Sequence, residues 1–275
     1  MRIQFFADMP QLARIYQQQF KTWTAVQLQY RAAMIIWLIG IVIEPVVYLV
    51  VWTNVAQASG GEVNGFTVPD FAAYFIATMV VNHLAFTWHM WEYDYRIREG
   101  LLSPLLLRPL HPIHADVAEN LSYKAITSLV MFPAAAVLIL IFKPASSFTV
   151  IHTVAFAPSL ILAFSIQFLW GWALAMIAFW TTRVNAIIRM YFLGKIFLAG
   201  QLAPVALLPD WLQTIATFSP YRWMLSFPAE LLLARVSTAD IWWGLLAQVI
   251  WTILGVAAVK LIWRAGVKRY AAFGA

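Results

Sequence analysis

The stretch that decides the fold is residues 241–263, which read IWWGLLAQVIWTILGVAAVKLIW. It contains one charged residue, Lys260, and it is long enough to cross roughly 30 Å of hydrocarbon as a helix. Earlier apolar runs of the same kind lie at residues 32–53, 71–91, 121–142, 148–180 and 186–208. The sequence therefore predicts an all-α, polytopic membrane protein with six transmembrane helices.

The composition supports this class. Of 275 residues, 63% are hydrophobic and only 11% are charged, whereas soluble domains have about 45–50% apolar and about 25% charged residues. This excludes a soluble enzyme, a disordered protein and a nucleic-acid binder as first hypotheses. Six spans leave no room for a large extramembrane domain, so residues 1–275 form a single membrane domain. The chain has no cysteine, which excludes thiol chemistry and cysteine-bound metal.

Two segments look helical without being long enough or apolar enough to span. Residues 9–31 have apolar side chains at steps of three and four with interspersed charges, which is typical of a helix lying in the membrane interface. Residues 209–239 contain short apolar pieces broken by Pro209, Pro220 and Pro228. The pieces in residues 209–230 suit re-entrant helices, which are tolerated where protein covers their backbone.

The basic residues predict the orientation, because cytoplasmic flanks of spans are enriched in Lys and Arg. Fifteen of the 18 basic residues fall on one side of the six-span topology: Arg2, Arg14, Lys21, Arg31, Arg96, Arg98, Arg108, Lys124, Arg183, Arg189, Lys195, Lys260, Arg264, Lys268 and Arg269. The other side has Lys143, Arg222 and Arg235. Both termini are therefore expected in the cytoplasm.

No enzymatic motif is present: there is no zinc-protease helix, no nucleophile elbow and no phosphate-binding glycine loop. Gly194-Lys195 is followed by Ile196 rather than Ser or Thr, so any ATP must bind another chain. His89 and Glu92 have metal-ligand spacing, but a metal site needs three or four ligands. No metal site is predicted.

Polar residues within the spans are the candidates for a translocation pathway. They are Glu44, Asn82, His83, Gln167 and Gln201. A carboxylate at mid-span costs roughly 2.5–3.5 kcal/mol on insertion scales and usually faces protein or water. The alternative is ordinary hydrogen bonding between helices, worth about 0.6 kcal/mol per bond; for Glu44 it is bonding to the backbone freed by Pro45.

The connection after the second span begins with charges and becomes strongly apolar, from Tyr93 to Pro112. Ser103 can cap a short helix with Pro104 in its first turn, and Pro109 and Pro112 would stop it. Such an element is either a cytoplasmic docking feature or an interfacial helix with its leucines in lipid. On the other side, Arg222 and Glu230 are expected to pair or to hold the ends of the short pieces.

Taken in order, these features resemble the permeases of the ATP-binding-cassette (ABC) type-2 exporter family. The specific ones are the stretch from Arg98-Glu99-Gly100 to Arg108-Pro109 and the segment from Pro220-Tyr221-Arg222 to Pro228-Ala229-Glu230. The resemblance is strongest to short bacterial permeases that often occur as two related chains with one ATPase. One departure is Ser103-Pro104, where a polar or acidic residue is expected.

The resemblance implies a role for each segment. Residues 9–31 would be a connecting helix, and residues 96–110 would hold a coupling helix that docks on the ATPase. The coupling residues would be Arg96, Arg98, Glu99, Gly100, Leu101, Leu105 and Arg108, and the re-entrant gate would hold Pro220, Tyr221, Arg222, Pro228 and Glu230. Two permease chains, identical or related, would form the pathway in the bacterial inner membrane and bind two ATPases, which would carry the ATP and Mg²⁺.

The resulting hypothesis is the membrane subunit of an ATP-driven exporter for a hydrophobic or amphipathic small molecule or lipid, itself without catalytic activity. Glu44, if ionised, would favour a cationic cargo. A second hypothesis is an ion-coupled secondary transporter that uses Glu44 and His83. A third is a membrane scaffold that transports nothing.

Overall fold

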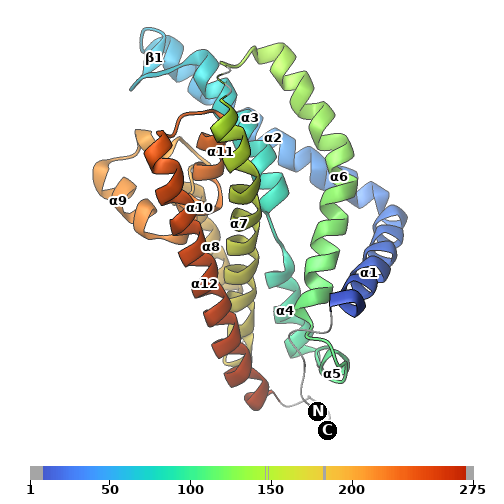
Figure 1. The fold of residues 1–275 in the computed structure, drawn as a ribbon. Coiled ribbons are helices and arrows are strands. Elements are labelled where there is room, and N and C mark those ends of the chain that lie inside the picture. Colours follow the sequence, from blue (N-terminus) through green and yellow to red (C-terminus); the bar gives the residue numbers. More distant parts are fainter. Residues whose placement is uncertain (1–8, 146, 148, 182–183, 271–275) are drawn as a thin grey trace.

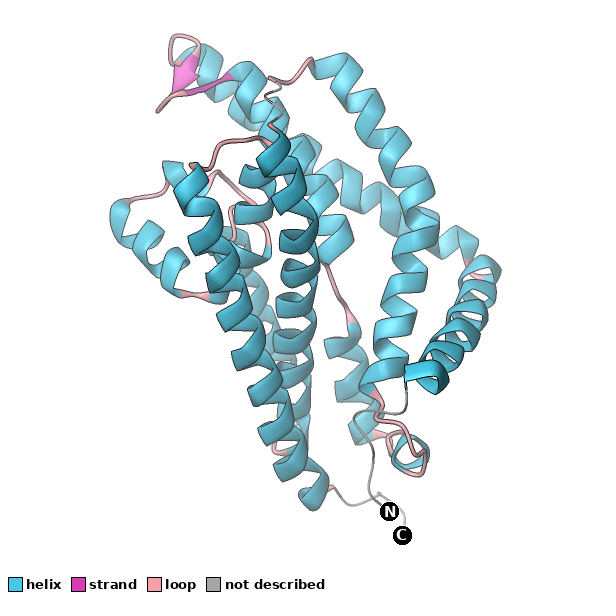
Figure 2. Cartoon of the chain, in the orientation of Figure 1, coloured by secondary structure: helices cyan, strands magenta, loops and turns pink. Residues whose placement is uncertain are grey.

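The computed structural model describes residues 9–145, 147, 149–181 and 184–270, and almost all of this chain is helical (Figures 1 and 2). Two short strands, β1 (Glu62–Val63) and β2 (Phe66–Thr67), form the one hairpin of the described residues. The predicted all-α membrane architecture is confirmed. Five helical segments of the described chain are long and apolar enough to cross a membrane.

These five segments match five of the expected spans with shifted ends. They are α2 (Arg31–Ala58), α3 (Val68–Ala85) with α4 (His89–Arg98), α6 (Ile113–Phe142), α7 (Val150–Ala175) with the 3-10 turn η1 (Met176–Phe179), and α12 (Thr238–Arg269). The second segment continues past residue 91 to Arg98, and the third begins at Ile113 rather than at residue 121. Both therefore extend into the connection that the sequence predicts between them. Their polar residues there find partners within the protein, so the helix continues where the sequence indicates a loop.

The fifth expected span, residues 186–208, differs most. Helix α8 (Val184–Leu198) has 15 residues, about 22 Å at 1.5 Å per residue, which is short of the hydrocarbon thickness. The chain turns at Gly200, whose φ is +80° and whose carbonyl accepts a 2.7 Å hydrogen bond from the Tyr74 hydroxyl. The segment then continues as the 3-10 turn η2 (Val205–Leu207).

The N-terminal helix α1 (Met9–Gln29) lies along one half of α6 (Figure 1). The hydroxyl of Tyr16 is 3.0 Å from His114 Nδ1, and the hydroxyls of Thr24 and Ser122 are also 3.0 Å apart. The expected amphipathic helix is therefore present, and one of its faces docks on protein.

A short helix, α5 (Ser103–Leu106), lies in the connection between α4 and α6, at the end of the molecule opposite the β-hairpin (Figure 1). Three short helices precede the last span: α9 (Asp210–Phe218), α10 (Pro220–Met224) and α11 (Ser226–Leu232). The main core lies between α7, α12, α4 and η1 and is rich in aromatic side chains, with Trp172 and Trp263 in contact.

Candidate functional site

A cavity of about 1000 Å³ lies between α1, α2, α3, α4, α6 and α8. Its walls combine aromatic rings with charged and polar side chains. The aromatic lining residues are Trp37, Phe86, Trp88, Trp91, Tyr123 and Phe192, and the charged or polar ones are Gln27, Glu44, Asn82, His83, Glu92, Glu119, Lys124, Lys195 and Gln201. A cavity of this size and chemistry can hold a drug-sized amphipathic molecule.

Four of the five predicted pathway residues line this cavity: Glu44, Asn82, His83 and Gln201. Glu44 accepts a 2.7 Å hydrogen bond from Gln201 Nε2 and a 3.3 Å bond from the Tyr48 hydroxyl. The structure thus joins α2 to the turn after α8. His83 Nε2 is 3.1 Å from the hydroxyl of Thr127 on α6.

The fifth, Gln167, is buried in α7 behind the wall. Its Oε1 accepts a 2.8 Å bond from Lys195 Nζ, and its Nε2 donates to the Met224 carbonyl at 3.3 Å. Gln167 therefore positions Lys195 and provides a hydrogen-bond donor for the Met224 carbonyl, at the junction of α10 and α11. Its role is that of a support for the cavity.

The cavity residues that the sequence interpretation missed include two lysines, Lys195 and Lys124. Lys195 is 2% exposed, and its ammonium donates 2.8 Å bonds to Asn82 Oδ1 and Gln167 Oε1. Lys124 is 6% exposed and donates a 2.6 Å bond to the Phe86 carbonyl. From sequence, both count among the basic flanks of the spans, whereas the structure buries both side chains in the helix bundle, where they line the cavity.

A signal for both lysines was present in the sequence. Lys124 falls within the predicted span 121–142 and Lys195 within 186–208, each surrounded by apolar residues. An ionisable residue inside a span is a functional candidate by default. Removing both from the count of fifteen leaves thirteen against three, so the expected orientation does not change; Arg2 and Arg183 of that count lie outside the described residues.

A break between α3 and α4 explains the position of Lys124. The chain leaves the helix at Phe86, with φ −60° and ψ 142°, and resumes at His89. A broken helix exposes backbone carbonyls that have to find other partners in the membrane. The Lys124 ammonium supplies one for the Phe86 carbonyl, so it holds the break together.

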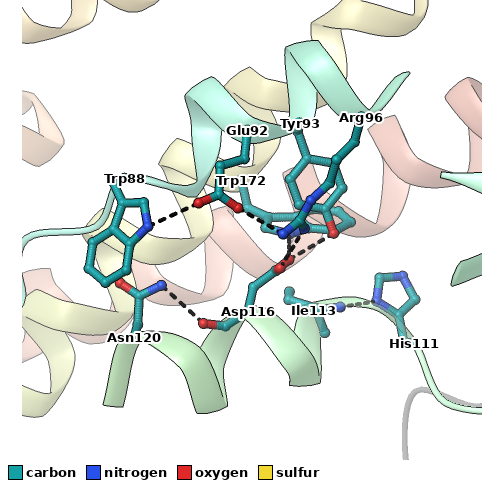
Figure 3. Close-up of polar contacts among 9 residues, drawn as sticks. All are labelled: Trp88, Glu92, Tyr93, Arg96, His111, Ile113, Asp116, Asn120 and Trp172. Carbon is teal, nitrogen blue, oxygen red and sulfur yellow. Dashed lines mark hydrogen bonds and ion pairs between the residues drawn. The ribbon is translucent and has the colours of Figure 1, made fainter. Parts of the chain in front are cut away.

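A second polar cluster gathers around Asp116 (Figure 3) and borders the cavity at Glu92. The Asp116 carboxylate is 2% exposed and accepts three bonds: 2.7 Å from the Tyr93 hydroxyl, 2.9 Å from Arg96 Nη1 and 2.9 Å from Trp172 Nε1. Arg96 also pairs with Glu92 at 2.7 Å. This cluster ties α4, α6 and α7 together.

Arg96 is therefore directed into the protein, unlike the other predicted coupling residues. Arg98 pairs with Asp94 at 3.0 Å while its side chain is 44% exposed. Glu99, Leu101 and Arg108 are exposed, and Gly100 and Leu105 are half-buried. Gly100 has a φ of +72°, which a glycine adopts readily, and it turns the chain toward α5.

Ser103 does not cap α5, contrary to expectation. Its hydroxyl lies 3.0 Å from the hydroxyl of Tyr270, at the end of α12. Pro104 does occupy the first turn, as predicted. The hydroxyl links the short helix to the last span rather than to its own backbone.

The expected pairing of Arg222 with Glu230 is confirmed at 3.4 Å. Helices α10 and α11 pack against α3, α7 and α8, so protein covers their backbone. Pro220 begins α10, Tyr221 packs against Gly194 of α8, and Pro228 is buried in α11. Gln248 of α12 donates a 2.8 Å bond to the Trp223 carbonyl.

Outside the spans, burial shifts the pKa of His111 and the pKa of Tyr16. It lowers the pKa of His111 from 6.5 to about 3, with a further contribution from the neighbouring His114. The Ile113 N–H donates to His111 Nδ1 at 3.2 Å (Figure 3), as expected for a neutral ring. Burial likewise raises the pKa of Tyr16 to about 12.

His89 and Glu92 do not form a metal site with other side chains in the described residues, where no three His, Cys, Asp or Glu side chains gather. Glu92 accepts hydrogen bonds from Trp88 and Arg96. His89 is buried against Phe168, with ring centroids 4.5 Å apart. Both residues belong to the packing of α4.

The fold and the cavity define a multi-pass helical membrane protein of the transport class. The sequence model of a family described as "ABC-2 family transporter protein" matches residues 42–274, so the chain belongs to this family. The searches of curated proteins and of solved structures found no match. Family membership makes the chain a membrane transport subunit and implies association with ABC ATPases.

Proposed function

We propose that this chain is the permease subunit of an ATP-driven ABC exporter that moves an amphipathic or hydrophobic small molecule or lipid across the bacterial cytoplasmic membrane. The observation that carries the proposal is the cavity of about 1000 Å³, lined by charged groups and aromatic rings within the bundle. Its lining groups come from six helices, so a relative movement of these helices changes its shape.

The proposed energy source is a separate ATPase that holds ATP and Mg²⁺. Its docking surface is α5 with the exposed residues around it, Arg98, Glu99, Leu101 and Arg108. The Leu102 N–H, directly before α5, donates a 3.1 Å bond to the Arg96 carbonyl. The Arg96 side chain bonds to Asp116 of α6, which also accepts from Trp172 of α7. A push on α5 would therefore reach the wall of the cavity through hydrogen-bonded side chains rather than through a loose loop.

The proposed assembly has two permease chains, identical or related, and two ATPases. Both termini and α5 lie on the cytoplasmic side in this proposal. The connecting helix α1 flanks α6 there, and α9 to α11 close the pathway from the opposite side. The chain itself carries out no covalent chemistry in this scheme, and coupling is conformational.

The experiment compares two charge reversals of exposed basic residues at opposite ends of the molecule, Arg108→Glu and Lys143→Glu. The tagged chain is purified from its native membranes with the ATPase that accompanies it. We expect Arg108→Glu to lower the bound ATPase and the ATP-dependent transport severalfold, and Lys143→Glu to leave both unchanged.

Equal ATPase binding by both variants would contradict the proposed docking surface. The exporter proposal fails if transport in inverted vesicles follows a proton gradient and ignores ATP, as the ion-coupled hypothesis requires. Transport that is absent under every condition, despite an intact fold, would favour the scaffold.

A further inference from the structure

Two buried ammonium groups face the cavity without a carboxylate at ion-pair distance. Lys195 and Lys124 both line the cavity and are almost completely buried. The ion pairs of the described residues all use arginine as the cation. Burying a charge without a counter-charge is unfavourable, so these two ammoniums favour an anion beside them.

Among the described residues, the hydrogen-bond acceptors beside both ammoniums are neutral: Asn82, Gln167 and the Phe86 carbonyl. Each ammonium has three N–H donors. The described residues accept two bonds from Lys195, through Asn82 and Gln167, and one from Lys124, through the Phe86 carbonyl. The Phe86 ring lies 5.0 Å from the Lys195 ammonium. The two cations thus flank the same break between α3 and α4, with donor capacity left over on the cavity side.

The carboxylates of the cavity have other partners or lie elsewhere. Glu44 accepts from Gln201 and Tyr48, and Glu92 accepts from Arg96 and Trp88. Glu119 precedes Lys124 by five residues on α6, which is about 7.5 Å along the helix at 1.5 Å per residue. None of these carboxylates forms an ion pair with either ammonium in the described residues.

We infer that the cavity binds an amphipathic anion, with its negatively charged group at Lys124 and Lys195 and its apolar part against the aromatic wall. Trp37, Trp91 and Phe192 supply apolar surface on α2, α4 and α8. The inference rests on the proposed function where it identifies this anion as the cargo. It replaces the cationic cargo that Glu44 alone suggested.

The test measures binding to the purified permease, without ATPase, in phosphatidylcholine nanodiscs. The probes are 12-bromododecanoate and 12-bromododecyltrimethylammonium, which share a chain and differ in charge. Bromine quenches tryptophan on contact, and Trp37, Trp88 and Trp91 line the cavity. Partition into the lipid is the same for every variant, so differences between variants report the cavity.

The decisive variant is Asn82→Asp. It places a carboxylate where Asn82 Oδ1 accepts from Lys195 and so neutralises the cation at nearly constant volume. Gln167→Glu does the same from α7 and gives an independent variant. Asn54→Asp, an exposed position on α2, is the matched control. Circular dichroism and the elution volume show that each variant is folded.

We expect the half-quenching concentration of the bromododecanoate to rise about tenfold in Asn82→Asp and in Gln167→Glu, equivalent to about 1.4 kcal/mol. That of the ammonium probe should stay constant or fall, and Asn54→Asp should match the wild type. Folded variants that bind the anion like the wild type would overturn the inference. A wild type that binds the ammonium probe but not bromododecanoate, with that binding weakened by Glu44→Gln, would overturn it as well.

A second experiment distinguishes the two kinds of amphipathic anion that the site could bind, an anionic membrane lipid and a single-chain amphipath. Adding phosphatidylglycerol to the nanodiscs lowers the partition of the anionic probe for every variant alike. If an anionic lipid occupies the site, the half-quenching concentration rises more for the wild type than for Asn82→Asp. If only single-chain amphipaths fit, it rises equally for both; both results support an anion site. Because no ATPase is present, a failure of ATP-driven transport leaves this binding result intact. A failure of binding likewise leaves the coupling experiment with Arg108→Glu intact.

Discussion

Replacing Asp116 by alanine should destabilise the bundle more than removal of any exposed carboxylate. The change removes the acceptor of three hydrogen bonds and leaves the donors of Tyr93, Arg96 and Trp172 without it. The carboxylate is 2% exposed, so water does not readily replace it. The three donors come from two helices, α4 and α7, so their attachment to α6 is weakened together.

The loss of unfolding free energy expected for Asp116→Ala can be bounded from below and from above. Three hydrogen bonds at the membrane average of about 0.6 kcal/mol set a lower limit of roughly 2 kcal/mol. Breaking a buried ion pair from one side costs about 3–5 kcal/mol in soluble proteins. Arg96 keeps Glu92 at 2.7 Å and is 19% exposed, which moves the expected loss to about 3 kcal/mol. That loss corresponds to a fall of roughly 6–12 °C in the unfolding midpoint.

The assay is thermal unfolding of the purified chain in detergent, followed by intrinsic fluorescence and by the fraction that stays monodisperse. Heating of such a protein is often irreversible, so the apparent midpoints are compared at one scan rate. Asp116→Asn keeps an acceptor for one neutral donor and should lose about half as much. Glu62→Ala, in the exposed hairpin, is the control. An Asp116→Ala midpoint equal to that of Glu62→Ala would refute the reasoning.

Two further predictions concern pH and backbone. Because the unfolded His111 takes up a proton near its ordinary pKa of 6.5 and the folded one only near 3, its contribution to stability should fall as the pH drops from about 6.5 toward 3; His111→Asn should show a shallower fall of the melting midpoint, and equal slopes would contradict this. Gly200→Ala should destabilise more than Gly60→Ala, because both have positive φ but an added Cβ meets the Tyr74 hydroxyl only at Gly200. We expect about 1 kcal/mol for the φ alone and about 1–3 kcal/mol more for overpacking, and equal melting midpoints would refute the steric argument.

Most of the fold could be predicted because the relevant signals are local. An apolar run of about 20 residues inserts whatever its neighbours do, so five spans lie where the sequence places them. The short pieces before α12 were also found, since Pro220 and Pro228 interrupt the apolar pattern. The break between α3 and α4 gave no such signal, because Phe86, Thr87 and Trp88 include neither proline nor glycine.

The site was predicted less completely than the fold. Glu44, Asn82, His83 and Gln201 were identified because polar residues in a span are conspicuous. Other residues were misread because their partners are distant in the chain. Arg96 looks like a surface charge until Asp116, on the next span, is placed beside it.

The sequence by itself determined that this is a helical membrane protein, because insertion depends on the composition of each segment, and the order of its motifs resembles the ABC-2 permeases. Only the tertiary structure decided what the few charges do. Lys195 meets Asn82 across 113 residues of chain and Lys124 meets Phe86 across 38. Whether a lysine flanks the membrane or lines a cavity depends on such partners, and no local pattern contains them.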